Sequence, residues 1–439
     1  MSAHPPRRAP QSARQRGQAM LLTVLLLGVG VSAVVYNFVA PAKQSIERDR
    51  ITVQALAQAK DALIGYAAAD NRPGSLPCPD GTNSGVAGSP IPTDCPGYVS
   101  GNVYVGRLPW RSLRLPDLRD GYGERLWYAV SREYARNSST CGSCPLNSDT
   151  PGQLTITGGP SGVIAIVFSP GAVVGSQVRD TPNENNVSHY LEGGNQLGIT
   201  TNTFVNALAT ATFNDKLLPI TREALFPVVE MRVARELRLT LRSYYTANRY
   251  YPYAASFPGY ASTPNTYRGY IPATISTCVP APGIADPLTA VPGGAAGWFI
   301  ANNWHQVMVY AVAPRCTPKI TSISEIHATP PACALSCGSG PPYTCDMPST
   351  MTIDASVLNC VDVSRAFLTV TGISSTIESL VLPASYRLGA QPARPCSSIS
   401  DCLESVGADN QNIDSPDNYQ YVKPVRSSGN NDSLVIVSP

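Results

Sequence analysis

Charged side chains are scarce in this sequence. Asp, Glu, Lys and Arg together make up 14% of its 439 residues, and the formal net charge at pH 7 is only +2. The basic residues are dispersed along the chain and do not cluster with aromatic residues, as they would in a nucleic-acid-binding surface. Nucleic acid is therefore not an expected partner.

Histidine is rarer still, with four residues in the whole chain. The His-Glu-x-x-His, Gly-x-Ser-x-Gly, phosphate-loop and dinucleotide-binding motifs are all missing from the sequence. Asp117 and Asp120 could be imagined as an acid and a base, but between Pro116 and Gly121 we expect them to accept turn hydrogen bonds. We therefore expect a protein that is not an enzyme and carries no cofactor.

Proline and glycine are abundant, with 40 and 35 residues. This composition is typical of short strands joined by long irregular loops. The length is too great for one ordinary domain and fits two domains of about 170–210 residues.

One long stretch, residues 18–40, contains no charged side chain. As a helix rising ~1.5 Å per residue it would cross a hydrocarbon core of ~30 Å. Arginines precede it and mixed charges follow it, which predicts a cytoplasmic N-terminus and an exported remainder. A secretory signal peptide is the alternative, although the stretch is long for one and no small-x-small cleavage site precedes Pro41.

The segment after this stretch is amphipathic. Ile46, Val53, Leu56 and Leu63 recur at helical spacing. The sequence thus predicts one helix over residues 18–66, transmembrane in its first part and bent at Pro41.

The start of the helix carries a family signature. Arg16-Gly17 followed by residues 18–23 resembles the type IV pilin and type II secretion pseudopilin superfamily, and residues 120–128 resemble the turn and first sheet strand of major pseudopilins. The resemblance implies a leader ending at Gly17, cleavage before Gln18 by a prepilin peptidase, and other pilin or pseudopilin subunits as partners. It also implies a single pass through the bacterial inner membrane and a head, a helix packed on an antiparallel sheet, in the periplasm or in an extracytoplasmic filament.

The sequence departs from the family pattern at two positions. Gln18 stands where most members have an aromatic residue or Met, and Leu22 stands where nearly all have Glu. That Glu is thought to pair with the N-terminal amine of a neighbouring subunit, so its loss implies a minor subunit at or near a tip. The resemblance does not distinguish a secretion pseudopilus from a pilus, and an anchored periplasmic binding or adhesion protein that is never processed remains the alternative.

The part of the sequence expected to be exported contains an internal repeat of two copies. Each copy opens with a helix that ends at a tyrosine, Tyr66 in the first copy and Tyr244 in the second. An Asn-Arg pair and then a proline follow the tyrosine in both copies. The further matches pair residues 122–131 with 304–313, 165–171 with 366–372, 190–192 with 402–404, and 214–221 with 431–438. We therefore expect an α+β fold, with a leader over residues 1–17, the long helix over 18–66, and two tandem pilin-like heads over 67–222 and 223–439.

Twelve cysteines lie mostly in loop-like sequence. In an exported chain they predict up to six disulfides, whose connectivity the spacing does not fix. The near pairs are Cys78 with Cys95, Cys141 with Cys144, Cys278 with Cys316, Cys396 with Cys402, and Cys333, Cys337, Cys345 and Cys360 among themselves. Zinc is the competing interpretation because Cys141 and Cys144 have ligand spacing, but no second close pair accompanies them.

One loop is rich in hard oxygen ligands. Asp180, Asn183 and Glu184 follow an expected strand and are calcium candidates. A regular calcium-loop spacing is missing, so an ordinary solvated loop is the simpler interpretation.

Overall fold

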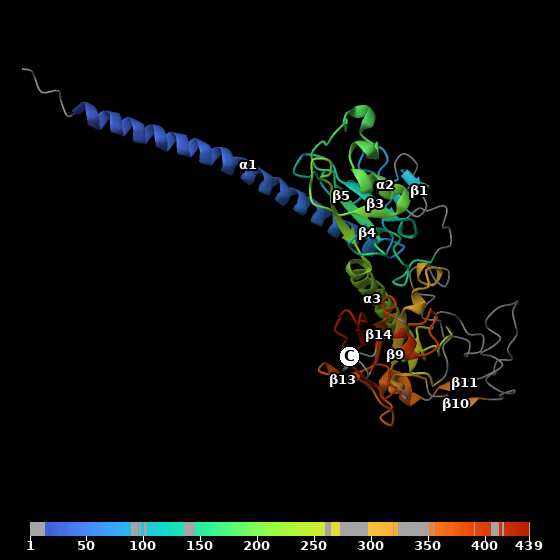
Figure 1. The fold of residues 1–439 in the computed structure, drawn as a ribbon. Helices are drawn as coiled ribbons and strands as arrows, with labels where there is room; N and C mark the ends of the chain where they lie inside the picture. The colour runs from blue at the N-terminus through green and yellow to red at the C-terminus, as the bar shows by residue number, and fades with distance from the viewer. Residues whose placement is uncertain are drawn as a thin grey trace, which may run out of the picture.

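The computed structural model describes residues 14–88, 95, 98–100, 103–135, 145–259, 265–272, 297–318, 320–323, 351–353, 355–389, 391–404, 412–414 and 417–438. The chain forms an α+β fold with several sheets and few helices. Two of the helices are long and each packs on its own sheet (Figure 1).

Helix α1 (Arg14–Ala69) is continuous over 56 residues. Its C-terminal half buries Ala55, Leu56, Ala59, Leu63 and Ala67 on one face, because residues three or four apart lie above one another on a helix. This face packs on strands β5 and β7, while the N-terminal half extends away from the rest of the molecule (Figure 1).

The expected membrane crossing is wrong. Within the described part of the chain, no helix combines the length and the apolar character that a bilayer crossing requires. The expected location as a single-pass protein of the inner membrane is therefore not supported either.

The first sheet is antiparallel in the order β1-β2-β3-β5-β7. The strands are β1 (Tyr98–Ser100), β2 (Val103–Arg107), β3 (Trp127–Ser131), β5 (Ala165–Ser169) and β7 (Lys216–Ile220). Side chains alternate between the two faces, so Tyr128 and Val167 join the core beneath α1 while Trp127 and Phe168 join a second core on the other side. Helix α2 (Gly193–Thr201) and the parallel pair β4 (Thr155–Thr157) and β6 (Thr203–Val205) lie on this second side. We call α1 and this sheet, to Ile220, the first unit.

Helix α3 (Arg222–Asn248) begins the second unit. It buries Phe226, Val229, Val233, Leu237 and Leu241 at helical spacing and ends where Arg249 takes a left-handed conformation. Its sheet has the antiparallel order β16-β14-β9-β8, formed by β8 (Arg268–Tyr270), β9 (Met308–Val312), β14 (Ser379–Pro383) and β16 (Val435–Ser438).

Several short elements complete the second unit and the loops. Two small sheets pair β10 (Ile320–Ile323) with β11 (Met351–Ile353), and β12 (Leu368–Val370) with β13 (Ser374–Ile377) and β15 (Gln420–Tyr421). The short helices are α4 (Trp298–Ala301), α6 (Ile399–Cys402), η1 (Arg132–Tyr134), η3 (Thr181–Asn183), η4 (Val187–His189), η7 (Trp304–Gln306), η8 (Pro314–Cys316) and η9 (Ala355–Cys360).

The two units share one strand order. Strands β2-β3-β5-β7 follow α1, and strands β8-β9-β14-β16 follow α3, with the same sequence of neighbours. One expected match is wrong: the strand in the position of β5 is β14, whereas residues 366–372 contribute β12 to a small separate sheet. Both segments are apolar and end at a turn, so their patterns do not separate them.

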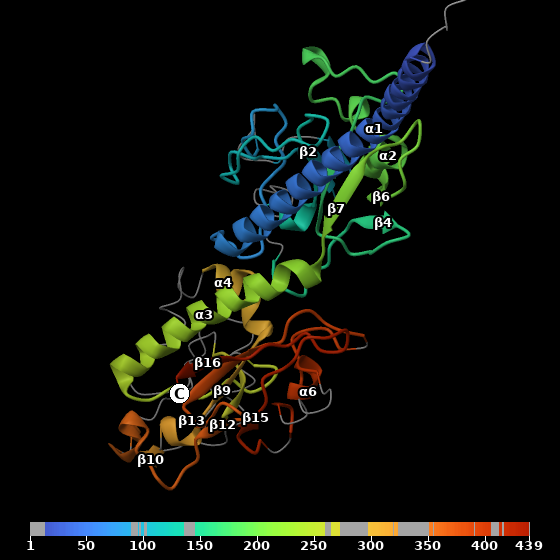
Figure 2. The same ribbon diagram turned by 90° about the vertical axis from the view of Figure 1, so that its left-hand side faces the viewer.

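An aromatic contact joins the two units. Phe226 of α3 lies between Tyr134 of the first unit and Trp304 of the second, with ring centroids 6.2 and 6.5 Å away. All three side chains are fully buried. Figure 2 shows α3 running beneath the end of α1 at this junction.

A buried amide fixes the same junction. Asn302 Oδ1 accepts hydrogen bonds from Arg72 Nε and from the Leu146 amide, each at 3.1 Å. Asn147 Nδ2 also donates to Asn302, to its carbonyl oxygen, at 2.9 Å. All three donors belong to the first unit and all three acceptors to Asn302 of the second, and two of the bonds are fully buried. We infer that they hold the units in one relative orientation.

This junction yields a stability prediction. Replacing Asn302→Ala removes the acceptor of the Leu146 amide in a buried site, so the free energy of unfolding should fall by roughly 1–3 kcal/mol. The matched control is Arg387→Ala, which breaks the partly exposed ion pair with Asp149 across the same junction (2.9 Å) and should cost no more than about 1 kcal/mol. Urea unfolding measures both variants, and equal losses would contradict the buried amide's role.

Candidate functional site

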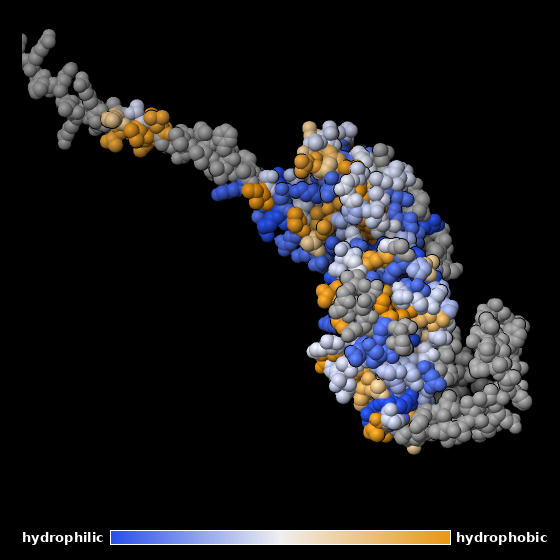
Figure 3. Space-filling view, turned by 60° about the horizontal axis from the view of Figure 1, so that its bottom comes forward, coloured by the Kyte–Doolittle hydropathy of each residue, from blue (hydrophilic) through white to orange (hydrophobic). Residues whose placement is uncertain are grey.

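The N-terminal end of α1 is the most unusual surface of the described chain. Seven apolar side chains between residues 20 and 27 are 60–72% exposed: Met20, Leu21, Leu22, Val24, Leu25, Leu26 and Leu27. Successive helical residues are ~100° apart, so these side chains surround the helix rather than forming one stripe. Figure 3 shows them as an apolar stretch separated from the body of the molecule.

The family-implied site residues lie on this same helix. Gly17 and Gln18 are within the helical span of α1, and Leu22 is 60% exposed. From Gly17 to Ala42 the sequence has no charged side chain, so Leu22 stands in a wholly neutral stretch. An exposed apolar surface of this size indicates a site that other apolar groups cover.

Contacts of Arg48, Asp49 and Thr52 hold α1 where it meets the rest of the first unit. Gly121 packs so closely that a Cβ would lie 2.2 Å from the carbonyl oxygen of Arg48, and its amide donates to Thr52 Oγ1 at 3.0 Å. Lys216 of β7 pairs with Asp49 at 2.7 Å. The helix is thus held at a defined point and the residues before it project freely from the body (Figure 1).

Of the two aspartates near these contacts, Asp120 holds a turn, as the sequence predicts, whereas Asp117 pairs with the side chains of Arg119 and Arg125. Asp120 accepts four hydrogen bonds, from the amides of Tyr122, Glu124 and Gly171 and from the Ser169 hydroxyl. Burial raises the pKa of Asp117, but hydrogen bonds from Arg125 and Arg119 outweigh it and leave the pKa below its usual value. Neither carboxyl is placed as a general acid.

The calcium candidates are engaged by nitrogen donors. Asn183 Nδ2 donates to Asp180 Oδ1 at 2.6 Å, and Asn83 Nδ2 donates to Glu184 Oε2 at 3.2 Å. Arg107, which the sequence did not single out, donates to the carbonyl oxygen of Glu184. A cationic neighbour and two amide donors are unfavourable surroundings for a divalent cation, and calcium binding here stays a prediction.

Arg107 is held by aromatic rings as well. Its guanidinium lies 4.4 Å from the ring of Trp127 and 3.9 Å from that of Tyr190. Burial lowers the pKa of this arginine below its ordinary value, more than the contact with Tyr190 raises it. The arginine anchors the loop of the calcium candidates to the sheet.

Three disulfides are present among the described cysteines. Cys78–Cys95 and Cys396–Cys402 are the near pairs that the spacing predicts. Cys316 bonds to Cys360, so its expected pairing with Cys278 and the pairing of Cys360 within its own group are wrong. Cys141, Cys144, Cys278, Cys333, Cys337 and Cys345 lie outside the described residues.

One cluster within the described residues has the composition of a metal site. Atoms of Cys316, Cys360 and Glu378 all lie within 4.8 Å of one another. The two sulfurs are bonded to each other, which removes the thiolates that zinc would need. The cluster is a disulfide beside a carboxylate.

No family model, curated protein or solved structure matches this chain.

The disulfides predict a ranking of stability effects. Loop-closure entropy grows with the sequence separation of the bonded cysteines, which is 44 for Cys316–Cys360, 17 for Cys78–Cys95 and 6 for Cys396–Cys402. Paired Cys→Ser variants should therefore lose about 4, 3 and 2 kcal/mol in that order. Denaturant unfolding of the three double variants tests this, and a reversed order would contradict the entropic account.

Proposed function

We propose that this protein is a non-enzymatic minor subunit of an extracytoplasmic filament, of the kind found in type IV pili and type II secretion pseudopili. The observation that carries the proposal is α1. Its C-terminal half is a structural helix of the first unit, and its N-terminal end is an apolar rod with no covering in the described part of the chain. This division of one helix is what the resemblance of residues 16–23 implies.

The energetics favour other subunits as the covering. Burying a Leu side chain is worth about 1.5–3 kcal/mol, and residues 20–27 offer seven large apolar side chains around the whole helix. A flat surface would cover only one side of such a rod. A bundle of similar helices from neighbouring subunits covers it on all sides.

Two features support a low-copy position at or near an end. Leu22 cannot form the ion pair that the family's usual Glu makes in an apolar core, where such a pair gains strength from the low dielectric. The chain also carries two helix-on-sheet units where a repeating subunit has one head, and this bulk would crowd a shaft if repeated at every position.

The disulfides support an oxidising surrounding. Bonds of this kind persist in secreted and surface proteins and are rare where thiols are kept reduced. The alternative is an extracytoplasmic binding or adhesion protein whose leader is never removed.

The first test reads the N-terminus. Mass spectrometry of the chain purified from its own host should find Gln18 as the first residue, because cleavage after Gly17 is the step that admits a subunit to a filament. Gly17→Val should abolish cleavage, whereas the control Gly28→Ala on the same helix should not. An intact leader in the unaltered chain would favour the alternative.

The second test reads the apolar rod. The double variant Leu21→Ser and Leu25→Ser should reduce recovery with sheared filaments by about tenfold or more, because it removes two large apolar contacts. The control is Leu239→Ser on α3, which is 68% exposed but lies on the second unit. Equal losses for rod and control variants, or no loss for either, would argue against helix-mediated assembly.

A further inference from the structure

The first unit contains a pair of buried carboxyl groups between the start of α2 and the start of β7. Glu192 lies just before α2 and Asp215 just before β7, and both are more than nine-tenths buried. The Glu192 amide donates to Asp215 Oδ2 at 2.9 Å, and the Asp215 amide donates to Glu192 Oε2 at 3.2 Å. These reciprocal bonds bring the two side chains into contact.

The second unit contains the same pair at the matching place. Glu404 follows α6 and Asp432 precedes β16. The Glu404 amide donates to Asp432 Oδ2 at 2.9 Å, and the amide of Asn431 donates to Glu404 Oε2 at 3.2 Å. Both carboxyl groups are again more than nine-tenths buried.

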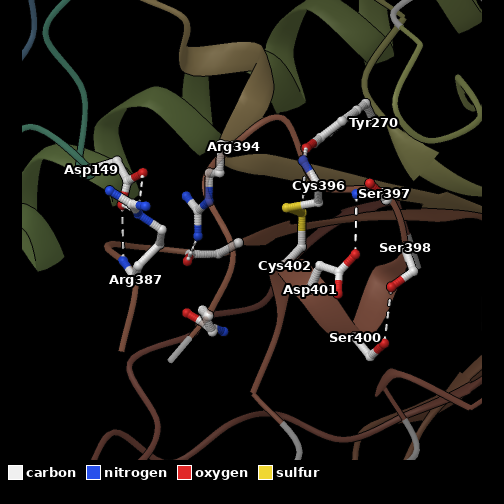
Figure 4. Close-up of a disulfide and its surroundings, with 12 residues drawn as sticks. Asp149, Tyr270, Arg387, Arg394, Cys396, Ser397, Ser398, Ser400, Asp401 and Cys402 are labelled. Carbon is white, nitrogen blue, oxygen red and sulfur yellow. Dashed lines mark hydrogen bonds and ion pairs between the residues drawn. A yellow bond between two sulfur atoms is a disulfide. The ribbon is translucent and has the colours of Figure 1, made fainter. Parts of the chain in front are cut away.

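The surroundings of the two pairs are also alike. A glutamine side chain donates to each glutamate, from Gln177 Nε2 to Glu192 Oε1 at 2.7 Å and from Gln391 Nε2 to Glu404 Oε1 at 3.1 Å. An arginine ties the start of each segment to backbone carbonyls, Arg179 in the first unit and Arg394 in the second (Figure 4). The same arrangement in both units indicates a feature of the fold.

The hydrogen bonds leave one vacancy in each pair. Among the described residues Asp215 Oδ1 and Asp432 Oδ1 have no donor, although each is buried beside its glutamate. Two carboxylates in contact cannot both keep a negative charge away from water. A proton placed on the aspartate supplies the missing donor and removes one of the two charges.

Within the described residues no charged group forms an ion pair with either acid pair, although Arg394 lies close enough to Asp432 to offset part of the rise in its pKa. Around the first, Lys216 binds Asp49, while Arg179 binds backbone carbonyls and Glu124. Around the second, Arg394 binds the carbonyls of Ser385 and Ala384. The other titratable groups on the elements packed around the pairs each contact another residue. The contacts are Asp120 with Ser169, His189 with the Val178 amide, Tyr190 with Arg107, Tyr386 with Arg222, Asp401 with the Ser397 amide, and Arg426 with Glu230.

We propose that the two acid pairs are proton-operated latches. In each unit a segment follows the third strand of the four-stranded core, which is β5 in the first unit and β14 in the second. One proton shared between the glutamate and the aspartate holds this segment against the last strand, β7 or β16. When the proton leaves to water, charge repulsion opens the latch and releases the segment. Residues 172–191 of the first unit are then exposed, while Cys396–Cys402 restrains the corresponding segment of the second unit (Figure 4).

The direction of the pH effect follows from the protonated closed state. Burial first, and the neighbouring Glu192 second, raise the pKa of Asp215 from 3.8 to about 8, and burial and Glu404 raise that of Asp432 in the same direction. A raised pKa contributes stability that is complete below the ordinary pKa and is lost as the pH rises through the raised one. The latch of the first unit is therefore tight near pH 4 and weakens up to about pH 8.

Hydrogen exchange of the full chain tests the proposal. After correction for the intrinsic rate, the opening constant of residues 172–191 should rise up to about tenfold per pH unit between pH 5 and pH 8, since one proton is lost on opening. Asp215→Asn places a permanent amide donor where the proton sits and should remove this dependence. The control Asp180→Asn, in the same segment but outside the pair, should keep it.

Two outcomes would overturn the latch: a segment whose corrected opening does not change with pH, or a dependence that Asp215→Asn leaves intact. If Asp215→Asn fails to fold, infrared titration of the unaltered protein decides instead. A protonated-carboxyl band should be present at pH 6 and lose intensity as the pH rises through about 8, where Asp215 titrates. A spectrum without the band at pH 6 would also overturn the proposal.

Discussion

The structure depends on how one long helix buries its apolar side chains. The C-terminal half of α1 does so within the chain, against β5 and β7. The N-terminal end cannot, because residues 20–27 project from the body and no described element reaches them. The hydrophobic effect favours burial of the apolar side chains in both halves. Only the C-terminal half achieves this burial within the chain, so the N-terminal end needs a partner to cover it.

The second unit repeats the arrangement without the projecting end. Helix α3 begins at Arg222, directly after β7, and packs on its own sheet along its length. The buried Phe226 and Asn302 at the junction fix it to the first unit, so the bulk of both units moves with α1. The chain thus has one projecting helix and two joined bodies, and this shape is the basis of the proposed position at a filament end.

The sequence predicted the features that depend on local pattern. Helical spacing from Ile46 to Leu63 predicted the long helix, although α1 runs from Arg14 to Ala69, and the aromatic runs predicted β3 and β9. The membrane assignment rested on the lack of charge over residues 18–40, and no helix in the described part of the chain meets the requirements of a membrane span. The error of placing residues 366–372 in the main sheet arose because a strand pattern does not specify the neighbouring strand.

Long-range pairings could not be predicted in this way. Cys360 bonds to Cys316 across 44 residues although several cysteines are closer in sequence, since the fold and not proximity decides the partner. Glu192 and Asp215 lie 23 residues apart and become a pair only when α2 and β7 are in place. Their sequence matches, Glu404 and Asp432, were visible as a repeat, but the contact between them was not.

The central claim is that this chain occupies an end of a filament rather than its shaft. Quantitative mass spectrometry of sheared, purified filaments, together with labelling of the second unit under the electron microscope, measures this directly. The account predicts a copy number far below that of the major subunit and label at one end of each filament. Abundance comparable to the major subunit, with label along the shaft, would contradict it.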